Sequence, residues 1–493
     1  MQPLYVHNLT RLYLRSDMPH NSQITSFNAP LNDAVGPFVP FYATPPLHNC
    51  GVDIGPRMFG AAERFYMDTM SMMRLRYILK PTFQIYGDLG SGKSSIAKIY
   101  AWEGGAIYNG QRKSRVYADN HRNLNGIGEY DRLARLYDST LINLEERINP
   151  FDSSLGLGMS DHLETAVAIY ESYNEGASPN RHMKLAMRVA LYEMLKDEQQ
   201  ETPSAELFAK ILLNIRKEHG LDYTKGVIET VRKTDLPSAP VEPLSELKDD
   251  EYVERIMDVS LTKEELDSGN INWEEFTVDA GLVAEAVLGF LDGEYGETFG
   301  GTASFGDKFG QRFVGIDFSH KNDQTIAFLI AMVLKVKESA TLRRDRRFMF
   351  DIEIMDENSA LWAIPTFARA MAKRLKHARS ESTTIIQISH RPQDYATVGE
   401  AGSQVRSLAV NSRKDIGATF FARFEDKENV DYITEAFGFS AVERSHLMNL
   451  EPGQYGLFLP GRGLHFFKAD LTPVRQWLIE SNAAMHNALE RVS

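Results

Sequence analysis

The 493-residue sequence contains a single cysteine, Cys50. One cysteine cannot form an intrachain disulfide, and no cysteine-based metal cluster is suggested. An unpaired thiol is typical of a protein from a reducing compartment. We interpret Cys50 as a small buried residue rather than as a catalytic thiol.

Long hydrophobic runs and an excess of basic residues are also lacking. The longest apolar stretch, Ile326–Leu334, is too short to cross a bilayer, and the first ten residues lack the pattern of a secretory signal. We therefore expect a cytoplasmic protein that reaches the inner face of the cell membrane only through partners. The formal net charge of −13 argues against broad nonspecific binding of nucleic acid, although a basic channel inside an acidic ring would leave that charge unchanged.

The most informative segment that is present runs T-F-Q-I-Y-G-D-L-G-S-G-K-S-S-I-A-K-I over residues 82–99. Gly87, Gly92, Lys93 and Ser94 have the spacing of a Walker A loop, or P-loop, which wraps backbone N–H groups around phosphates. The lysine supplies a positive charge, and the serine hydroxyl can bind Mg²⁺. We therefore predict that the chain binds ATP with Mg²⁺. The predicted nucleotide-binding residues are Gly87, Asp88, Leu89, Gly90, Ser91, Gly92, Lys93, Ser94 and Ser95.

The segments on either side of the loop support this prediction. Phe83, Ile85 and Tyr86 predict a buried strand, whereas residues 95–100 predict the start of a helix. The order strand, loop, helix is the context that a P-loop requires.

A P-loop also needs an acidic partner at the end of a neighbouring strand. The run I-E-I-M-D-E at 352–357 supplies one. We predict that Asp356, together with Ser94, holds the magnesium shell, and that Glu357 orients or deprotonates the attacking water. Asp351, which interrupts the apolar strand, is a competing metal ligand.

Further polar groups follow the next strand-like run, at Ser389-His390-Arg391-Pro392. Polar side chains at the carboxyl ends of parallel strands belong to the ligand crevice. His390 is a candidate sensor of the γ-phosphate, with a surface or buried structural histidine as the alternative. Arg379 follows a helix-patterned stretch at 360–378 and is a candidate arginine finger for a neighbouring subunit, or else a solvated helix end.

The element pattern predicts an α/β fold: a RecA-like P-loop NTPase domain with a mainly parallel sheet, interrupted by an all-α insertion. Composition supports a globular protein, and the length predicts more than one structural unit. The predicted division is a small, partly β N-terminal segment at 1–75, the first half of the ATPase domain at 76–155, a helical insertion with an acidic linker at 156–285, and the second half with C-terminal strands and helix at 286–493.

Several short motifs occur in an order typical of one family. They are G-V-D-I-G at 51–55, R-I-N-P-F-D at 147–152, F-V-G-I-D-F-S at 313–319, the Asp356–Glu357 pair, H-R-P-Q-D at 390–394, and E-R-S-H-L-M-N-L-E-P-G-Q-Y-G-L-F at 443–458. Together they resemble the FtsK–HerA superfamily of ring-forming ATPases, and within it the conjugation and type IV secretion ATPases of the VirB-four type. The family's compact Asp-x-x-Gly-Glu-Tyr element is split here, because N-H-R-N-L-N-G-I separates Asp119 from Gly128-Glu129-Tyr130.

The resemblance implies an ATP-hydrolysing motor, hexameric when active, that drives DNA or protein transfer or apparatus assembly. Its implied partners are further copies of itself, secretion-channel components and possibly DNA. One alternative is a DNA translocase or coupling protein that pumps DNA directly, and another is a scaffold that binds ATP with little turnover. The predicted catalytic set is Lys93, Glu357, Arg379, His390, Arg391 and Glu129, with Ser94 and Asp356 as metal ligands.

Overall fold

The computed structural model describes residues 51–59, 64–107, 114–120, 128–139, 141–142, 147–152, 157–174, 176–196, 202–216, 273–293, 295–301, 311–318, 321–342, 350–357 and 359–480. Cys50, most of the predicted N-terminal segment and the acidic linker lie outside these residues.

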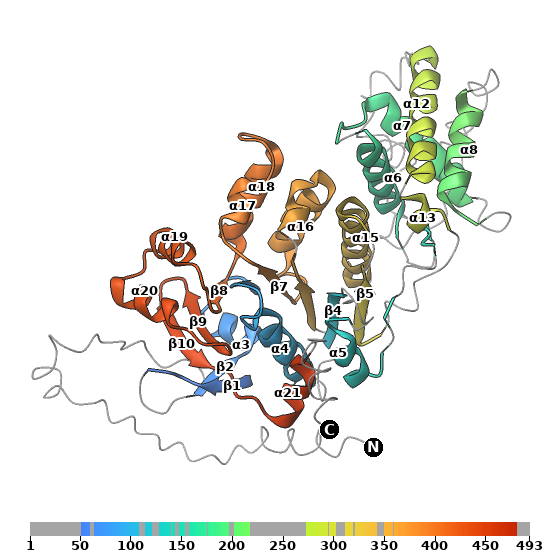
Figure 1. Cartoon of the computed structure of the whole chain (residues 1–493). Coiled ribbons are helices and arrows are strands. Elements are labelled where there is room, and N and C mark those ends of the chain that lie inside the picture. Colours follow the sequence, from blue (N-terminus) through green and yellow to red (C-terminus); the bar gives the residue numbers. More distant parts are fainter. Residues whose placement is uncertain are drawn as a thin grey trace, which may run out of the picture.

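The centre of the molecule is an eight-stranded sheet in the order β10-β9-β8-β3-β7-β6-β4-β5 (Figure 1). The strands are β3 (Thr82–Tyr86), β4 (Ser114–Asn120), β5 (Phe313–Asp317), β6 (Phe350–Met355), β7 (Thr383–Ser389), β8 (Ala418–Phe421), β9 (Gln454–Leu459) and β10 (Gly463–Lys468). The six strands from β8 to β5 are parallel, and β9 and β10 extend one edge in antiparallel pairing. The prediction of a mainly parallel α/β sheet is therefore confirmed.

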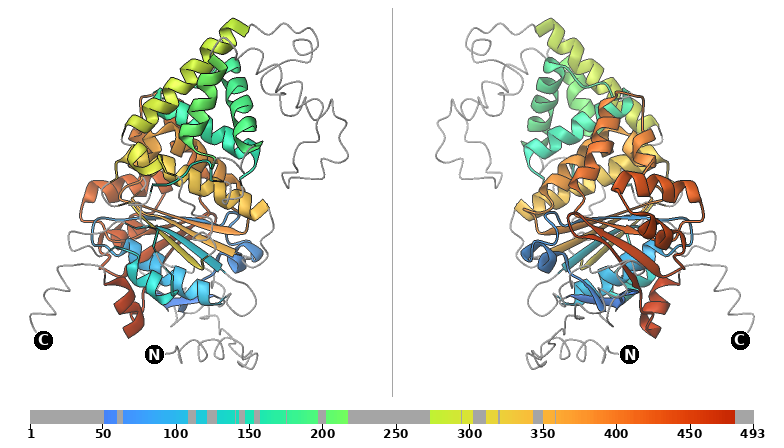
Figure 2. Two further views of the ribbon diagram at one scale, coloured as in Figure 1. Left: turned by 90° about the vertical axis from the view of Figure 1, so that its right-hand side faces the viewer. Right: turned by 90° about the vertical axis from the view of Figure 1, so that its left-hand side faces the viewer.

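Side chains of the central strands are buried on both faces of the sheet. All residues of β3 and β7 are buried, as expected where elements cover both sides of a parallel sheet. Alternate residues join different cores: Ile385 belongs to one hydrophobic cluster and Ile386 to the other. Figure 2 shows the resulting layers, with helices above and below the sheet.

One face is covered by α4 (Lys93–Ile107) and α5 (Asp131–Leu136), joined by α21 (Pro473–Ile479) near α4. A small antiparallel sheet of β1 (Val52–Pro56) and β2 (Arg64–Met67), followed by α3 (Thr69–Arg74), packs into the same core. Phe65 of β2 stacks on Phe467 of β10, with ring centroids 4.4 Å apart. The predicted β character of this early segment is confirmed for the part that the structure describes.

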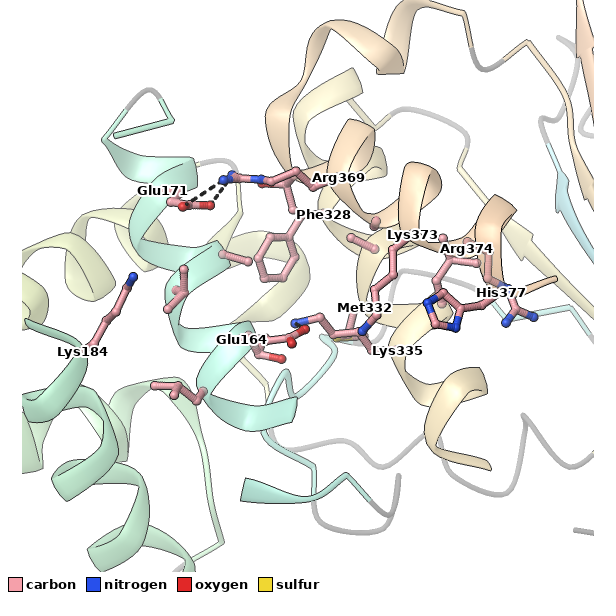
Figure 3. Close-up of a pocket in the computed structure, with 18 of the residues that line it drawn as sticks. Glu164, Glu171, Lys184, Phe328, Met332, Lys335, Arg369, Lys373, Arg374 and His377 are labelled. Atoms are coloured by element: carbon pink, nitrogen blue, oxygen red, sulfur yellow. Dashed lines mark hydrogen bonds and ion pairs between the residues drawn. The ribbon is translucent and has the colours of Figure 1, made fainter. Parts of the chain in front are cut away.

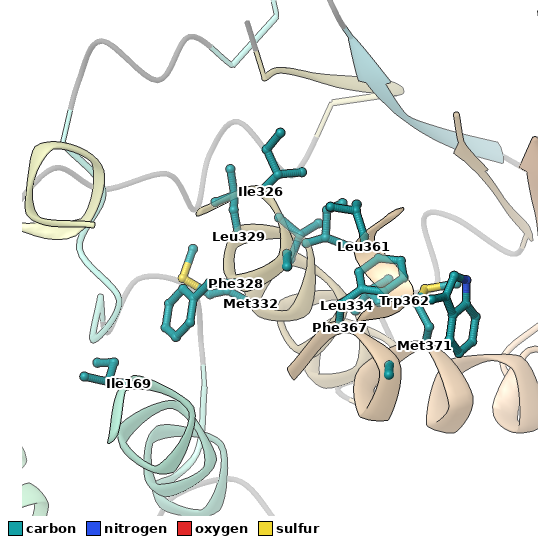
Figure 4. Packing of buried hydrophobic residues seen from close by; sticks show 14 of the residues in the cluster. Ile169, Ile326, Phe328, Leu329, Met332, Leu334, Leu361, Trp362, Phe367 and Met371 are labelled. Atoms are coloured by element: carbon teal, nitrogen blue, oxygen red, sulfur yellow. The ribbon is translucent and has the colours of Figure 1, made fainter. Parts of the chain in front are cut away.

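The other face carries α15 (Asp323–Leu342), α16 (Pro365–His377), α17 (Asp394–Thr397), α18 (Gln404–Ser412), α19 (Lys427–Phe437) and α20 (Ala441–Met448). In Figure 4, Phe328 and Met332 of α15 lie in the same core as Phe367 and Met371 of α16. Trp362 is fully buried and meets the ring of Phe367 edge-on at 5.7 Å.

The prediction of a single helix over 360–378 is wrong at the N-terminal end of that range. Residues Ala360–Ala363 form a 3-10 turn, and Ile364 then takes an extended conformation before α16 begins at Pro365. Proline disfavours a helical conformation in the preceding residue and is well tolerated as the first residue of a helix. The helix therefore starts five residues later than predicted.

Four helices lie beside the outermost strand β5 of the sheet, beyond α15 (Figure 1). They are α6 (Met159–Tyr173), α7 (Arg181–Lys196), α8 (Ala205–Arg216) and α12 (Trp273–Asp292), and the short α13 (Gly296–Phe299) follows. α12 packs against α6, α7 and α8. The boundaries at 75, 155 and 285 stay a prediction, and α12 continues past the last of them.

Two ion pairs and a cavity mark the junction between these helices and the sheet-based part. Arg369 of α16 binds Glu171 of α6 through two nitrogens, and Lys335 of α15 lies 3.0 Å from Glu164 (Figure 3). A cavity of about 370 Å³ lies between α6, α15 and α16. Within the described part of the chain, none of the helices has the length and apolarity needed to span a membrane.

Candidate nucleotide-binding site

The predicted P-loop joins the end of β3 at Tyr86 to the start of α4 at Lys93. Gly90 and Gly92 have φ angles of 74° and 91°, in the left-handed region where a side chain is strained. A Cβ on Gly92 would also lie 2.7 Å from the hydroxyl of Tyr455. That hydroxyl donates to the Gly92 carbonyl at 2.7 Å, so β9 supports the loop from behind. The predicted strand, loop and helix are confirmed as structure.

Lys93 is almost completely buried at the start of α4. Its Nζ donates to the Asp88 carbonyl at 3.0 Å and lies 3.4 Å from Nδ1 of His390. Burial lowers the pKa of Lys93, whereas the carboxylates of Asp356, Glu357 and Asp88 oppose that shift. Because this helix end carries a partial positive charge, the lysine adds to a site suited to an anion.

Asp356 directly follows β6 and faces α4. Its Oδ2 accepts hydrogen bonds from the Ser94 hydroxyl at 2.8 Å and from the Tyr130 hydroxyl at 3.0 Å. Burial raises the pKa of Asp356, and the charges of Glu129 and Glu357 raise it further. A hydroxyl and a carboxylate held together are the hard oxygen donors that Mg²⁺ prefers, and a cation offsets the cost of a buried carboxylate. The donor set therefore fits Mg²⁺.

Glu357 points outward from the same strand end. Its φ of 53° is unusual for a residue with a side chain, and its side chain is 59% exposed. One carboxylate oxygen lies 3.6 Å from Nε2 of His390, whose other ring nitrogen faces Lys93. Strained backbone of this kind gathers at functional sites because surrounding contacts must hold it in place. The imidazole of His390 thus lies between the side chains of Lys93 and Glu357.

Glu129 reaches this site although eight residues separate its motif from Asp119. Its carboxylate accepts a hydrogen bond from Lys98, a fully buried residue one turn after Ser94 on α4. The next residue, Tyr130, contacts Asp356 directly. Asp119 belongs to β4, and its side chain lies outside the described residues.

Two residues predicted to act at the site lie instead where the parallel strands begin, at the side of the sheet opposite the P-loop. Arg379 is exposed in the turn that connects α16 to the start of β7. Asp351 is near the start of β6 and pairs with Thr383, the first residue of β7. The P-loop follows the carboxyl end of β3, whereas both of these residues lie near the amino ends of strands. Neither side chain is therefore on the same side of the sheet as the P-loop of its own chain. Asp351 is therefore placed away from the predicted metal site.

A cavity of about 580 Å³ adjoins the P-loop at its open side. Its lining residues are Asp88, Leu89, His390, Arg391, Asp394, Glu425 and Asp426. Arg391 is exposed, and its backbone N–H donates to Asp394 at 3.0 Å. Arg391 therefore borders the site, and among the described residues no contact joins it to Lys93 or Asp356.

Sequence reasoning missed three side chains at this site. Tyr130 was visible as part of the Gly-Glu-Tyr motif, but nothing in the local pattern indicates that Lys98 would bind Glu129. Tyr455 also carries no local signal, because 363 residues separate it from Gly92 in the sequence.

The fold and the geometry of the loop together define a RecA-like P-loop fold. The structure is similar to that of VirB4 of Thermoanaerobacter pseudethanolicus, with 16% sequence identity and a TM-score of 0.55, over 87% of this chain and 99% of that chain. The plasmid coupling protein TrwB in complex with the GTP analogue GDPNP also matches, with 13% identity and a TM-score of 0.46 over 80% and 86% of the two chains. No family model matches the sequence, and no curated protein does. At 16% identity the likeness to VirB4 shows that the two chains share a fold, which agrees with the fold that the motifs predict.

Proposed function

We propose that this chain is a magnesium-dependent ATPase that converts ATP and water to ADP and phosphate. The observation that carries the proposal is the 2.8 Å hydrogen bond between Ser94 and Asp356, which joins the phosphate-binding loop to the acidic end of β6. A glycine-rich turn without function would not require a buried carboxylate against its serine. Mg²⁺, when bound by these two residues, would neutralise charge on the β- and γ-phosphates.

The remaining residues have distinct proposed tasks. Lys93 and the loop N–H groups bind the phosphates and stabilise the charge that develops during the reaction. The exposed Glu357 carboxylate orients the attacking water and accepts its proton. His390 lies between Lys93 and Glu357 and senses the γ-phosphate. Glu129, held by Lys98, is an accessory that adds negative charge beside Asp356.

We further propose that the hydrolysis drives a conjugative or type IV secretion apparatus at the cytoplasmic face of the membrane. The support is the fold shared with VirB4 along almost all of that chain, together with the ordered motifs. In this proposal the working form is a homohexamer, as the family resemblance implies. Arg379 lies where β7 begins, away from the P-loop of its own chain, and could complete only a neighbour's site. Channel components of the apparatus are the proposed membrane partners.

The first test is steady-state phosphate release by Lys93→Ala and Glu357→Gln. We expect each variant to lose about 100-fold or more of the turnover, because one removes phosphate binding and the other removes water activation. Lys376→Ala and Glu435→Gln, at exposed positions on α16 and α19, serve as matched controls. Normal hydrolysis by either site variant, or none by the unmodified chain under magnesium and ATP, contradicts the proposal.

A further inference from the structure

A second group of metal-ligating side chains lies among the four helices beyond α15, away from the P-loop. His182 is the second residue of α7, and Glu275 and Asp279 lie four residues apart on α12. Residues at this spacing share one face of a helix. One ligand atom from each of the three side chains lies within 4.8 Å of the others. α7 and α12 pack against each other, as Figure 1 also shows.

The distances do not fit direct hydrogen bonds. Nδ1 of His182 lies 3.6 Å from Oε1 of Glu275 and 3.8 Å from Oδ2 of Asp279. Hydrogen bonds between nitrogen and oxygen are mostly about 2.7–3.2 Å long. Ligand atoms bound to one tetrahedral metal ion at about 2.1 Å lie roughly 3.4 Å apart. The two distances from His182 are therefore close to the spacing of ligands on a single ion, and the two carboxylate oxygens lie within 4.8 Å of each other.

Charge also favours a cation at this position. Two carboxylates one helical turn apart repel each other, and Asp279 is only 8% exposed, so water screens it poorly. A divalent cation bound by both carboxylates would reduce this repulsion.

Asn180 holds the least exposed ligand in place. Its Nδ2 donates to Oδ2 of Asp279 at 2.9 Å, while its Oδ1 accepts from the N–H of Met183 in the first turn of α7. The asparagine is thus fixed at the helix start and orients the carboxylate, as outer-shell residues do around metal ions.

We propose that His182, Glu275 and Asp279 bind one divalent transition-metal ion, best matched by Zn²⁺, that connects α7 to α12. Imidazole nitrogen and carboxylate oxygen are both common zinc ligands, whereas Mg²⁺ is usually bound through oxygen alone. The site is separate from the proposed magnesium site, since it uses none of the same residues. Three protein ligands leave the fourth tetrahedral position to water, and the bound ion would stabilise the contact between α7 and α12.

The test uses the full chain after removal of metal by a chelator, without nucleotide or Mg²⁺. Zn²⁺ is titrated by calorimetry, and Co²⁺ is titrated by visible absorption, which reports nitrogen and oxygen ligation directly. We expect one ion per chain and a melting temperature that rises with Zn²⁺ concentration. His182→Ala, Glu275→Gln and Asp279→Asn should each lose this binding, and Asn180→Ala should weaken it by about tenfold or more.

Two controls separate this site from others. His377→Ala removes an exposed histidine on α16, and Asp356→Asn removes a proposed magnesium ligand, so both should retain the zinc site. Glu275 is 54% exposed, and its replacement by glutamine keeps the shape of the side chain, so this variant is informative even if a buried variant fails to fold. Failure of the unmodified chain to bind Zn²⁺ saturably, or unchanged binding by Glu275→Gln and His182→Ala, overturns the proposal.

Discussion

Asp356 is proposed to bind Mg²⁺, and its burial costs free energy of folding when its carboxyl group is charged. Burial raises the pKa of its carboxyl group, the charges of Glu129 and Glu357 add to that effect, and hydrogen bonds from Ser94 and Tyr130 oppose it. A raised pKa means that the folded protein binds the proton more tightly than the unfolded chain. This carboxylate therefore favours folding at low pH, and that contribution is lost as the pH rises through the raised pKa.

We predict that Asp356→Asn abolishes ATP hydrolysis but stabilises the nucleotide-free fold at neutral pH by about 1 kcal/mol, since the amide avoids burying a charge. Urea unfolding without Mg²⁺ measures the free energy of unfolding. Asp431→Asn is the matched control of opposite sign, because a hydrogen bond from Arg444 lowers the pKa of the exposed Asp431. Destabilisation by Asp356→Asn at neutral pH would contradict this account.

His465 on β10 should make the protein sensitive to acid. Burial, together with the positive charges of Arg57 and Arg462, lowers the pKa of His465 from 6.5 to about 4. A lowered pKa gives stability that is present above pH 6.5 and is lost as the pH falls toward 4. We predict that His465→Gln flattens the loss of unfolding free energy in this range, whereas His377→Gln, at an exposed position, does not. Parallel pH profiles for His465→Gln and the unmodified chain would rule this out.

At the scale of elements, α6 is joined to α16 by an ion pair with one buried member. Glu171 is 7% exposed and accepts hydrogen bonds from both terminal nitrogens of Arg369 and from Ser178 at 2.8 Å (Figure 3). Removal of the arginine leaves a carboxylate that is largely shielded from water. The contact is therefore a specific connection between the helical part and the sheet-based part.

We predict that Arg369→Ala lowers the stability of this junction by about 1–2 kcal/mol, so that amide hydrogens of α6 exchange about tenfold faster. Hydrogen exchange measured by mass spectrometry provides the readout. The double variant Glu171→Gln with Arg369→Ala should recover most of the protection, because no charge is then left without its partner. Unchanged exchange in the single variant would show that apolar packing alone holds α6.

At the scale of the whole molecule, the positions of the P-loop and Arg379 predict that ATP hydrolysis depends on other copies of the chain. The P-loop lies where the parallel strands end, and Arg379 lies where β7 begins. An arginine at that edge can contribute only to the site of another chain. The overall charge of −13 does not prevent this, because assembly depends on which local surfaces meet.

We predict that Arg379→Ala and Lys93→Ala are each inactive alone and that a mixture regains part of the ATPase activity. In mixed rings, a chain with intact Lys93 receives Arg379 from its Lys93→Ala neighbour. Phosphate release is measured across protein concentration, with and without single- and double-stranded DNA. No recovery in the mixture would argue against an arginine finger, and strong stimulation by DNA would favour the DNA translocase over the secretion motor.

The sequence by itself determined the local parts of this protein: the P-loop with its strand and helix, the apolar parallel strands, and the acidic pair after β6. Such features depend on neighbouring residues, whose spacing sets backbone conformation and burial. Tertiary structure alone decided that Tyr130 contacts Asp356, that Glu129 reaches the site through Lys98, and that Arg379 lies where β7 begins. It also brought His182 to Glu275 and Asp279. These contacts come from strand order and helix packing, in which many weak interactions between distant segments act together, and no short sequence pattern records their sum.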